Sequence, residues 1–383
     1  MVDGFDIAIV GGGIAGLSVA AELAPASRVV VLEAEDQPGY HATGRSAAIF
    51  AQNYGTPLVR ALTAWSAGAY RTMGDGVLSE RGLVRVAQPS QRDSLVRLYR
   101  DMTRDWPLTW LEAAEVEARV PLLRRGWASC GFVNEDAADM DVAAIMKTLA
   151  NRITSSGSEI LTGFRVAGIA KGPQGWTVRT RKDHQVTAQI VVNAAGAWAD
   201  EVAALAGTSP VGVVPKRRSA VSLDAPAGFK ASAMPMVVDA DETFFLKPEG
   251  GALMASPCDE TPALPGDSRP EEIDIAVCID RIESAFDVSI SRPRSTWAGL
   301  RTFVSDGNPV CGWDRQFPDF FWLAGQGGFG VQTAPALARL AADMLLGRGG
   351  AAVTAMKGVD PRRLSPHRFN SECSIYEEQG ELT

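Results

Sequence analysis

Closely spaced glycines near the start of the chain restrict its fold more than any other feature. The apolar run from Ile7 to Val10 is too short for a useful helix but suits a strand that is buried on both faces. Gly11, Gly13 and Gly16 follow it in the spacing G-x-G-x-x-G. Apolar residues then recur at helical spacing from Ile14 to Leu23. The pattern predicts a strand, a tight turn and a helix, which together begin an α/β domain.

Each glycine has a physical task in such a turn. Gly11 permits the turn, Gly13 lets a pyrophosphate approach the backbone, and Gly16 lets helix and strand pack closely. The anion then lies at the helix N-terminus, where unpaired N–H groups favour negative charge. A second apolar run, Val29 to Leu32, ends in Glu33, about 20 residues beyond the glycines, where an acid that binds a ribose hydroxyl is expected. These features predict a dinucleotide-binding domain.

The nearly uncharged stretch from Ile7 to Ala24 has two other interpretations, a signal peptide and a membrane-spanning helix. Asp3 and Asp6 precede it where a signal peptide carries basic residues, and the glycines would interrupt a spanning helix. We therefore expect no transmembrane segment.

Charge and cysteine usage limit the possible functions. The net charge of −8 and the pI of about 5.1 argue against a nucleic-acid partner, since phosphate binding calls for a basic face. The five cysteines never form C-x-x-C, which favours reduced thiols in a cytoplasmic protein over disulfides or a zinc site. The three histidines are far apart in the sequence, so we expect no metal and an organic cofactor that carries the chemistry.

The loop after Glu33 is the second distinctive stretch. It reads GYHATGRSAA from Gly39 to Ala48, and we expect Gly44, Arg45 and Ser46 to open a second helix that directs N–H groups and a cation at the pyrophosphate. With the first glycine turn, this loop makes the chain resemble the D-amino-acid oxidase family. Further segments resemble the D-arginine dehydrogenases, a branch of that family, in the same order to about residue 366: YGTP, NAAGAWAD, PKRRSA, FFLKP, TWAGLR, GGFGVQT and RRLSP.

The resemblance implies an α/β fold, with a glutathione-reductase-type, Rossmann-like FAD-binding domain. A second, α+β substrate domain is expected on a mixed or antiparallel sheet. The implied ranges are 1–53, 141–207 and 295–366 for the FAD-binding domain and 54–140 and 208–294 for the substrate domain. Residues 367–383 are polar and acidic, and we expect a partly disordered tail.

The resemblance also implies which residues bind FAD. The cofactor residues are Gly11, Gly13, Ile14, Ala15, Gly16, Glu33, Ala34, Gly44, Arg45, Ser46, Ala47, Ala48, Val166, Ala195, Gly196, Trp198, Gly328, Gly330, Val331 and Gln332. Cys311 lies in the general region where related sarcosine oxidases attach flavin covalently. Because a free cysteine is commonly a small buried hydrophobe, we expect non-covalent FAD.

Arginines are the candidates for substrate binding. Strand alternation places Arg217 and Arg218 on opposite faces, and spacing alone leaves open which of them enters a pocket. The resemblance selects Arg218 and Arg301 as ligands of a substrate carboxylate, which a planar guanidinium matches in bidentate fashion. It also places Tyr54 over the pocket, which Gly299 and Gln332 help to line. The implied reaction transfers hydride from an amino-acid α-carbon to flavin N5, and the imine then hydrolyses to a 2-oxo acid and ammonia.

The side-chain pocket departs from the D-arginine dehydrogenases. Ile49, Leu83 and Phe245 replace a histidine, the glutamate that binds the guanidinium, and a tyrosine. Without that glutamate a buried guanidinium would be unpaired, so we expect D-amino acids with uncharged, apolar or aromatic side chains. The alternatives are oxidation of a secondary amine, an imino acid or a 2-hydroxy acid, and a protein that binds NAD or binds a dinucleotide without turnover. The electron acceptor is oxygen or a quinone, and a quinone would allow peripheral membrane contact.

Overall fold

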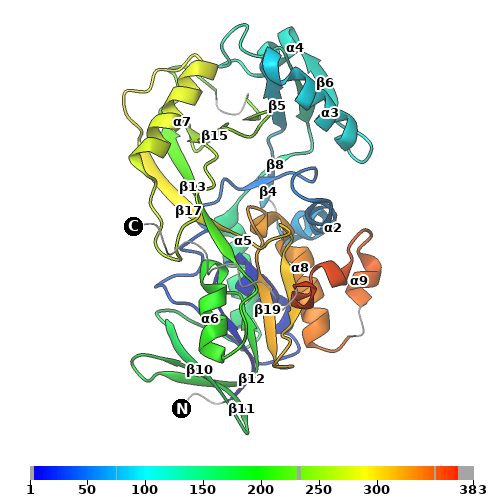
Figure 1. Ribbon diagram of the computed structural model, residues 1–383, viewed down its shortest axis with the longest axis vertical. Helices are drawn as coiled ribbons and strands as arrows, with labels where there is room; N and C mark the ends of the chain where they lie inside the picture. Colours follow the sequence, from blue (N-terminus) through cyan, green and yellow to red (C-terminus); the bar gives the residue numbers. More distant parts are fainter. Residues whose placement is uncertain (1–3, 75, 231–233, 349–350, 370–383) are drawn as a thin grey trace, which may run out of the picture.

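The computed structural model describes residues 4–74, 76–230, 234–348 and 351–369. Two eight-stranded sheets form the lower and upper halves in Figure 1, and a three-stranded sheet lies between them. The small sheet consists of β3 (Ile49–Phe50), β8 (Ala138–Met140) and β4 (Leu78–Glu80). No helix within the described residues is both long enough and apolar enough to cross a membrane.

The lower half contains the predicted strand, turn and helix. β1 (Phe5–Val10) leads into α1 (Ile14–Leu23) and is parallel to β2 (Val29–Leu32) and β12 (Gln185–Asn193). The other strands of the lower sheet are β9 (Glu159–Leu161), β10 (Val166–Gly172), β11 (Gly175–Thr180), β18 (Val310–Trp313) and β19 (Phe320–Ala324). The central strands are apolar on both faces because helices cover both. On one face lie α1, α2 (Pro57–Met73), α5 (Val142–Ser155) and α8 (Gly330–Leu345), and on the other lies α6 (Ala199–Ala206).

The first glycine turn has the predicted geometry. Gly11 has a φ of +108°, a conformation that side chains rarely adopt. A Cβ atom on Gly16 would lie 1.9 Å from the carbonyl oxygen of Gly11. Glycine at both positions therefore allows α1 to begin directly against the strand.

The upper half is a mixed sheet with helices on both faces. The strand order is β17 (Ser295–Phe303), β13 (Val214–Leu223), β16 (Ala252–Ser256), β15 (Phe245–Glu249), β14 (Met236–Asp239), β5 (Leu83–Ala87), β7 (Cys130–Asn134) and β6 (Thr109–Glu112). Val84 and Val86 pack in one apolar cluster with α4 (Ala113–Arg119) and α7 (Glu272–Ala285). α3 (Arg92–Met102) lies on the opposite face, where it packs against Ala87 and Phe132. Leu83 faces the other way, toward the segment 46–54 of the lower half. A mixed second sheet was predicted and is confirmed.

One structural expectation is wrong, and the strand pairing bears on a second. Gly44, Arg45 and Ser46 do not open a helix, because the chain forms turns up to Arg45 and then extends into β3. The predicted cofactor range beginning at residue 295 also includes β17, which pairs with β13 in the upper sheet along its whole length. The lower sheet resumes only with β18.

The end of the described chain is held against the lower half. The short helices α9 (Ala351–Ala355), η4 (Pro361–Arg363) and η5 (Pro366–Arg368) follow α8. Arg368 donates from Nε to Oδ2 of Asp306 at 2.9 Å. Residues 367–369 of the predicted tail are thus fixed by contacts, and residues 370–383 lie outside the described residues.

Candidate active site

A large cavity, with a volume of about 950 Å³, opens at the carboxyl ends of β1, β2 and β12. This is where open α/β sheets bind ligands. The predicted cofactor residues that line it are Gly11, Gly13, Ile14, Ala15, Glu33, Ala34, Arg45, Ser46, Ala47, Val166, Ala195, Gly196, Trp198, Gly328, Gly330 and Val331. Gly16 packs against Gly11, Gly44 lies close to the Gly39 carbonyl, and Ala48 and Gln332 line a second, smaller cavity.

The chemistry of the large cavity fits a dinucleotide such as FAD. Gly13, the N-cap of α1, has no side chain, and the first turn contains no acidic residue. Thr43 Oγ1 accepts from the N–H of Ile14 at 3.0 Å, and the other N–H groups of that turn suit an anion. Gln326, which is 9% exposed, lines the cavity, and its amide nitrogen has no hydrogen-bond partner within the described residues. A buried amide of this kind calls for a ligand or a water molecule.

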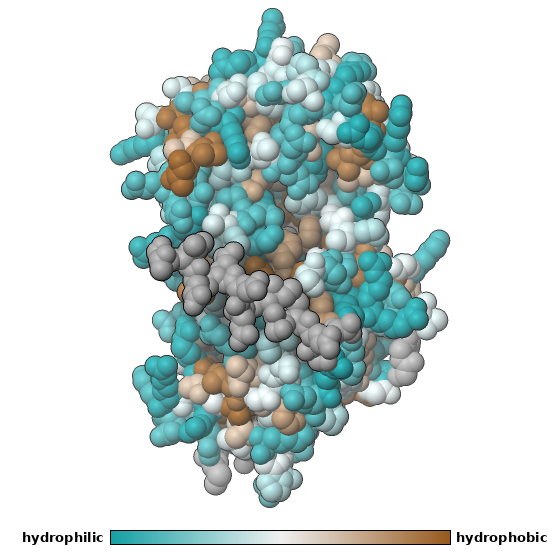
Figure 2. All heavy atoms as spheres, viewed as in Figure 1, coloured by the Kyte–Doolittle hydropathy of each residue, from teal (hydrophilic) through white to brown (hydrophobic). Residues whose placement is uncertain are grey.

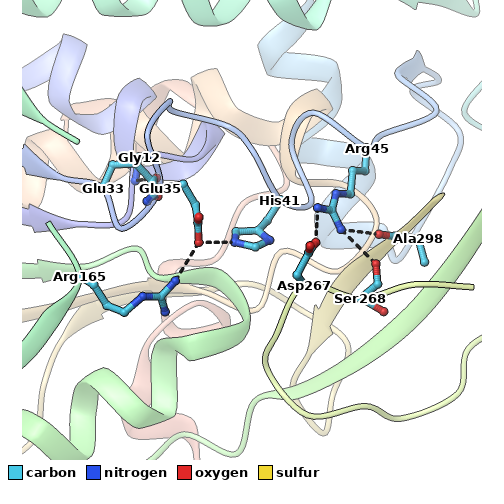
Figure 3. A network of polar contacts seen from close by, with 9 residues as sticks. All are labelled: Gly12, Glu33, Glu35, His41, Arg45, Arg165, Asp267, Ser268 and Ala298. Atoms are coloured by element: carbon cyan, nitrogen blue, oxygen red, sulfur yellow. Dashed lines mark hydrogen bonds and ion pairs between the residues drawn. The ribbon is translucent and has the colours of Figure 1, made fainter. Parts of the chain in front are cut away.

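Glu33 is held rigidly at the edge of this cavity (Figure 3). Its Oε2 accepts from the backbone N–H of Gly12 and its Oε1 from that of Glu35, each at 2.8 Å. Glu35 in turn bonds His41 at 3.0 Å and Arg165 at 2.8 Å. Because each carboxylate oxygen has a further lone pair, Glu33 can still accept from a hydroxyl group of a ligand.

Arg45 reaches from the lower half to the upper half across the rim of the cavity (Figure 3). Its Nη2 lies 2.5 Å from Oδ1 of Asp267, and its Nη1 donates to the carbonyls of Ser268 at 3.1 Å and Ala298 at 2.9 Å. The guanidinium therefore joins the two halves, in addition to lining the cavity.

A second cavity of about 60 Å³ lies between the upper sheet and segment 46–54. Apolar atoms are visible in the hollow between the two halves (Figure 2). The predicted residues that line the small cavity are Ile49, Tyr54, Leu83, Arg218, Phe245, Arg301 and Gln332. Arg218, Phe245 and Arg301 also line the large cavity, as does Gly299, so the two cavities adjoin.

The strand pairing brings the two predicted arginines together. Arg301 pairs with Lys216 across β17 and β13, and Arg218 lies two residues further along β13, so both side chains leave the same face. Arg217 leaves the opposite face, as predicted, and forms ion pairs with Glu271 at 2.5 Å and Asp274 at 2.9 Å.

The environments of Arg218 and Arg301 differ. Arg218 is held by the carbonyl of Asp259 and by Glu260, each at 2.9 Å. Arg301 has no hydrogen bond or ion pair to any side chain within the described residues. Its guanidinium lies against Gly328, where a Cβ atom would come within 2.8 Å of Arg301 Cζ. Glycine at position 328 therefore makes room for a cation that is free to bind an anion.

Tyr54 lies beside these arginines. Its hydroxyl donates to Oε2 of Glu242 at 3.2 Å, and its ring meets that of Phe329 edge to face. Burial raises the pKa of Tyr54, although the positive charge of Arg301 acts in the other direction. The phenol therefore stays protonated, and its single O–H can donate to a bound carboxylate in place of Glu242.

Cys311 belongs to the apolar core of the lower half. It is completely buried in β18, and burial raises the pKa of its thiol to about 12. It lines neither cavity, which agrees with the expected role as a buried hydrophobe. No group of three or more His, Cys, Asp or Glu side chains in the described part of the chain is arranged to hold a metal ion.

Sequence reasoning missed five residues of the small cavity: Arg85, Met236, Val238, Glu242 and Cys258. Arg85 could have been found, because alternation within the apolar strand places it on the same face as Leu83. Glu242 lies on the connection between β14 and β15 and carries no sequence signal that links it to the site.

The fold and this pair of cavities define a flavin-dependent oxidoreductase. The family model described as "FAD dependent oxidoreductase" matches residues 6–344, and the chain belongs to this family. The chain is 27% identical to a glycine oxidase of Pseudomonas aeruginosa over 370 residues, which cover 89% of this chain and 95% of that one.

Other relatives differ in coverage and in name. Identity to an L-2-hydroxyglutarate dehydrogenase of Salmonella houtenae is 27% over 226 residues, and the matched part spans only about half of that protein, 51%. The structure of glycine oxidase from Geobacillus kaustophilus superposes with a TM-score of 0.80 at 24% identity, covering 96% of this chain and 99% of that one. L-alpha-glycerophosphate oxidase from Mycoplasma pneumoniae with FAD bound has a TM-score of 0.81 at 18% identity, covering 90% and 95%.

Proposed function

We propose that this FAD-dependent enzyme oxidises the α-carbon of D-amino acids with uncharged side chains to 2-oxo acids and ammonia. The observation that carries the proposal is the guanidinium of Arg301, which has no counter-ion within the described residues and faces a largely apolar cavity. A charged group in such surroundings is costly without a partner, and a substrate carboxylate provides one.

The residues of the chain have separate roles in this proposal. Arg301 binds the α-carboxylate in bidentate fashion, and Arg218, which Glu260 and the Asp259 carbonyl hold in place, contacts it from the neighbouring strand. The hydroxyl of Tyr54 turns from Glu242 to donate to the same carboxylate. FAD supplies the acceptor for the two electrons when it is bound. No histidine among the described residues lines the small cavity, so the amine is expected to react as its neutral form without a protein base.

The lining of the small cavity supports an uncharged side chain. Ile49, Leu83 and Phe245 are apolar, and Glu242 is already paired with Arg85 at 2.8 Å. A substrate guanidinium would therefore lack a free carboxylate, which argues against D-arginine. The volume of about 60 Å³ is far below the roughly 300 Å³ at which sites for drug-sized ligands begin, so the substrate is small.

That small volume also favours a second candidate, the oxidation of glycine or of a small secondary amine. The full-length similarity to a glycine oxidase supports the same candidate. A 2-hydroxy acid would use the same arginines, since they recognise only the carboxylate.

A panel of substrates under anaerobic conditions tests these candidates by bleaching of the flavin absorbance. The panel contains D- and L-leucine, D- and L-methionine, D-arginine, glycine, sarcosine, L-proline and both 2-hydroxyglutarates. We expect the fastest reduction with D-leucine or D-methionine. Faster reduction by D-arginine or by the L-isomers would refute the proposal, and faster reduction by glycine or sarcosine would select the second candidate. Turnover with oxygen and with a quinone then identifies the acceptor.

A further inference from the structure

A third arginine, Arg85, lines the small cavity, and it is paired with a carboxylate of the protein itself, that of Glu242. Arg85 Nη2 lies 2.8 Å from Oε1 of Glu242, and its Nη1 donates to the carbonyl of Ala240 at 3.4 Å. The other carboxylate oxygen of Glu242 accepts from Tyr54. The pair is thus part of the cavity wall. Neither member is a proposed ligand of the α-carboxylate, although Glu242 contacts Tyr54 of that site.

Arg85 enters the cavity from the side opposite to Arg218. In the upper sheet, β13 and β5 are separated by β16, β15 and β14, which makes four strand-to-strand steps. At about 4.8 Å per step, the two backbones are about 19 Å apart. Both side chains nevertheless line the same small cavity. A substrate whose carboxylate is bound by Arg218 and Arg301 therefore extends its side chain toward Arg85.

The two partners of the pair are anchored very differently. The side chain of Arg85 is 6% exposed and rises from the middle of β5, whereas that of Glu242 is 40% exposed. Glu242 has a φ of +56° on the connection between β14 and β15. The cation is therefore a fixed part of the cavity, and the carboxylate is supplied from a connection at its rim.

We propose that Arg85 is a masked second carboxylate site, and that Glu242 determines side-chain specificity by occupying it. This proposal rests on the proposed binding of the α-carboxylate by Arg218 and Arg301. With Glu242 in place the far end of the cavity carries no free charge, so neutral side chains are accepted. An acidic side chain is rejected, because its carboxylate would lie against that of Glu242. Without Glu242, the buried guanidinium of Arg85 becomes a receptor for the second carboxylate of a dicarboxylic substrate.

The test compares D-glutamate with D-glutamine, two substrates of nearly equal shape that differ in charge. The variants are Glu242→Gln, which can keep a hydrogen bond to Tyr54, and the double variant Glu242→Gln with Arg85→Met. Asp241→Asn is the matched control, because it makes the same charge change at the adjacent position, where Asp241 accepts from Gln91 at 2.7 Å. The dissociation constant of glutarate, read from the perturbed flavin spectrum, measures binding without turnover.

In the unchanged protein we expect kcat/KM for D-glutamine to exceed that for D-glutamate at least tenfold. Glu242→Gln should shift this ratio toward D-glutamate by about tenfold or more and tighten glutarate binding by a similar factor, equivalent to about 1.4 kcal/mol. Asp241→Asn should leave both unchanged, and the double variant should lose the gain. An unchanged ratio and unchanged glutarate binding in Glu242→Gln, or a gain that persists in the double variant, would overturn the inference.

The failure of the proposed function would look different. Suppose that the unchanged protein oxidises no D-amino acid while Glu242→Gln still tightens glutarate binding. The proposed function is then refuted, and the proposal of a masked carboxylate site at Arg85 is supported. Thermal unfolding of each variant identifies any that are misfolded. Glu242→Gln leaves the buried Arg85 without a counter-ion. The double variant removes both charges of the pair, so it contains no unpaired ion that would destabilise the fold.

Discussion

Arg301 is the residue on which the proposed chemistry depends most. Arg217 forms ion pairs with three carboxylates and Arg218 with one, but no described side chain neutralises Arg301. Ion pairs with good geometry offset the loss of hydration that a buried cation suffers. The protein therefore leaves a cation uncompensated at the junction of its two cavities, and this arrangement suits a site that gains its counter-ion with the substrate.

Replacement of Arg301 tests this role. We expect Arg301→Met to lower kcat/KM about 100-fold or more, since a charge-assisted, bidentate interaction is lost. Arg301→Lys keeps the charge but not the planar fork, and we expect an intermediate loss that appears mainly in KM. Steady-state kinetics with the best D-amino acid measures both, and the flavin absorbance per protein shows whether FAD is still bound. Wild-type KM values in both variants would rule out carboxylate binding by Arg301.

For single residues, the sequence was informative where a motif applied or where side chains alternate along a strand. The glycine spacing identified the turn, and alternation separated Arg217 from Arg218. The sequence could not reveal Glu242, because its contact with Arg85 joins positions 157 residues apart through two neighbouring strands. Such a pairing is a product of sheet topology and leaves no local pattern.

At the scale of elements, segment 46–50 connects the two cavities and depends on support from the upper sheet. Ser46 and Ala47 line both cavities, and Ala48 adopts a φ of +51°. The buried Lys247 of β15 donates to the carbonyl of Ala47 at 2.7 Å and pairs with Asp139 at 3.2 Å. From the sequence we expected a helix to open at Gly44, Arg45 and Ser46 and to direct N–H groups at the pyrophosphate. Pairing of β3 with β8 keeps the backbone extended instead.

A second element, the turn between β18 and β19, is organised by Asp314. Its carboxylate accepts from Thr208 at 2.7 Å, from Trp322 at 2.9 Å, and from the backbone of Gln316 at 2.8 Å. Burial alone would raise the pKa of Asp314, but these hydrogen bonds outweigh it and lower the pKa below the usual value. The charged form is therefore favoured in the folded protein.

The effect of Asp314 on stability should depend on pH. We expect Asp314→Asn to lower the free energy of unfolding by about 2–4 kcal/mol at pH 7, because buried donors lose a charged acceptor. The unfolded pKa is about 3.9 and the folded value is lower, so this stabilisation is complete above about pH 5 and is lost as the pH falls through the folded pKa. Urea unfolding at neutral pH and below pH 4 should show the gap between variant and wild type closing in acid.

A neighbouring carboxylate provides the control for that measurement. Asp319 pairs with Lys171 near the protein surface at 2.7 Å. Since exposed ion pairs contribute about 0–1 kcal/mol, Asp319→Asn should change stability little at either pH. If the difference in unfolding free energy between Asp314→Asn and wild type persists unchanged in acid, the carboxylate is not the stabilising group.

At the scale of the whole molecule, the two halves share the active site, and this limits what sequence segments can predict. The order of elements and the two sheets followed from the resemblance and from apolar patterning. The predicted boundary at residue 295 lies at the start of β17, which pairs with β13 of the upper sheet, and its Arg301 and Gly299 line cavities shared by both halves. A division into ranges assigns each residue to one half, whereas these side chains serve both.

Arg45 and Asp267 form an ion pair that links the two halves at the rim of the FAD cavity. Arg45 itself lines the cavity, so its replacement would affect cofactor binding in two ways. The side chain of Asp267 is 51% exposed. Its replacement by asparagine removes the ion pair and leaves Arg45 in the cavity lining. Because an exposed pair contributes up to about 1 kcal/mol, we expect Asp267→Asn to speed FAD release about two- to fivefold.

The rise of flavin fluorescence after dilution of the loaded protein measures this release. Salt screens exposed charges, so the difference between Asp267→Asn and wild type should shrink at about 1 M salt, where the Debye length is about 3 Å. Asp224→Asn serves as the control, since Asp224 forms a more exposed pair with Arg294 that has no contact with the cavity. Equal release rates for wild type and Asp267→Asn at low salt would show that the rim opens without breaking this pair. A difference that survives high salt would assign the effect to the hydrogen-bond geometry of Arg45 rather than to charge.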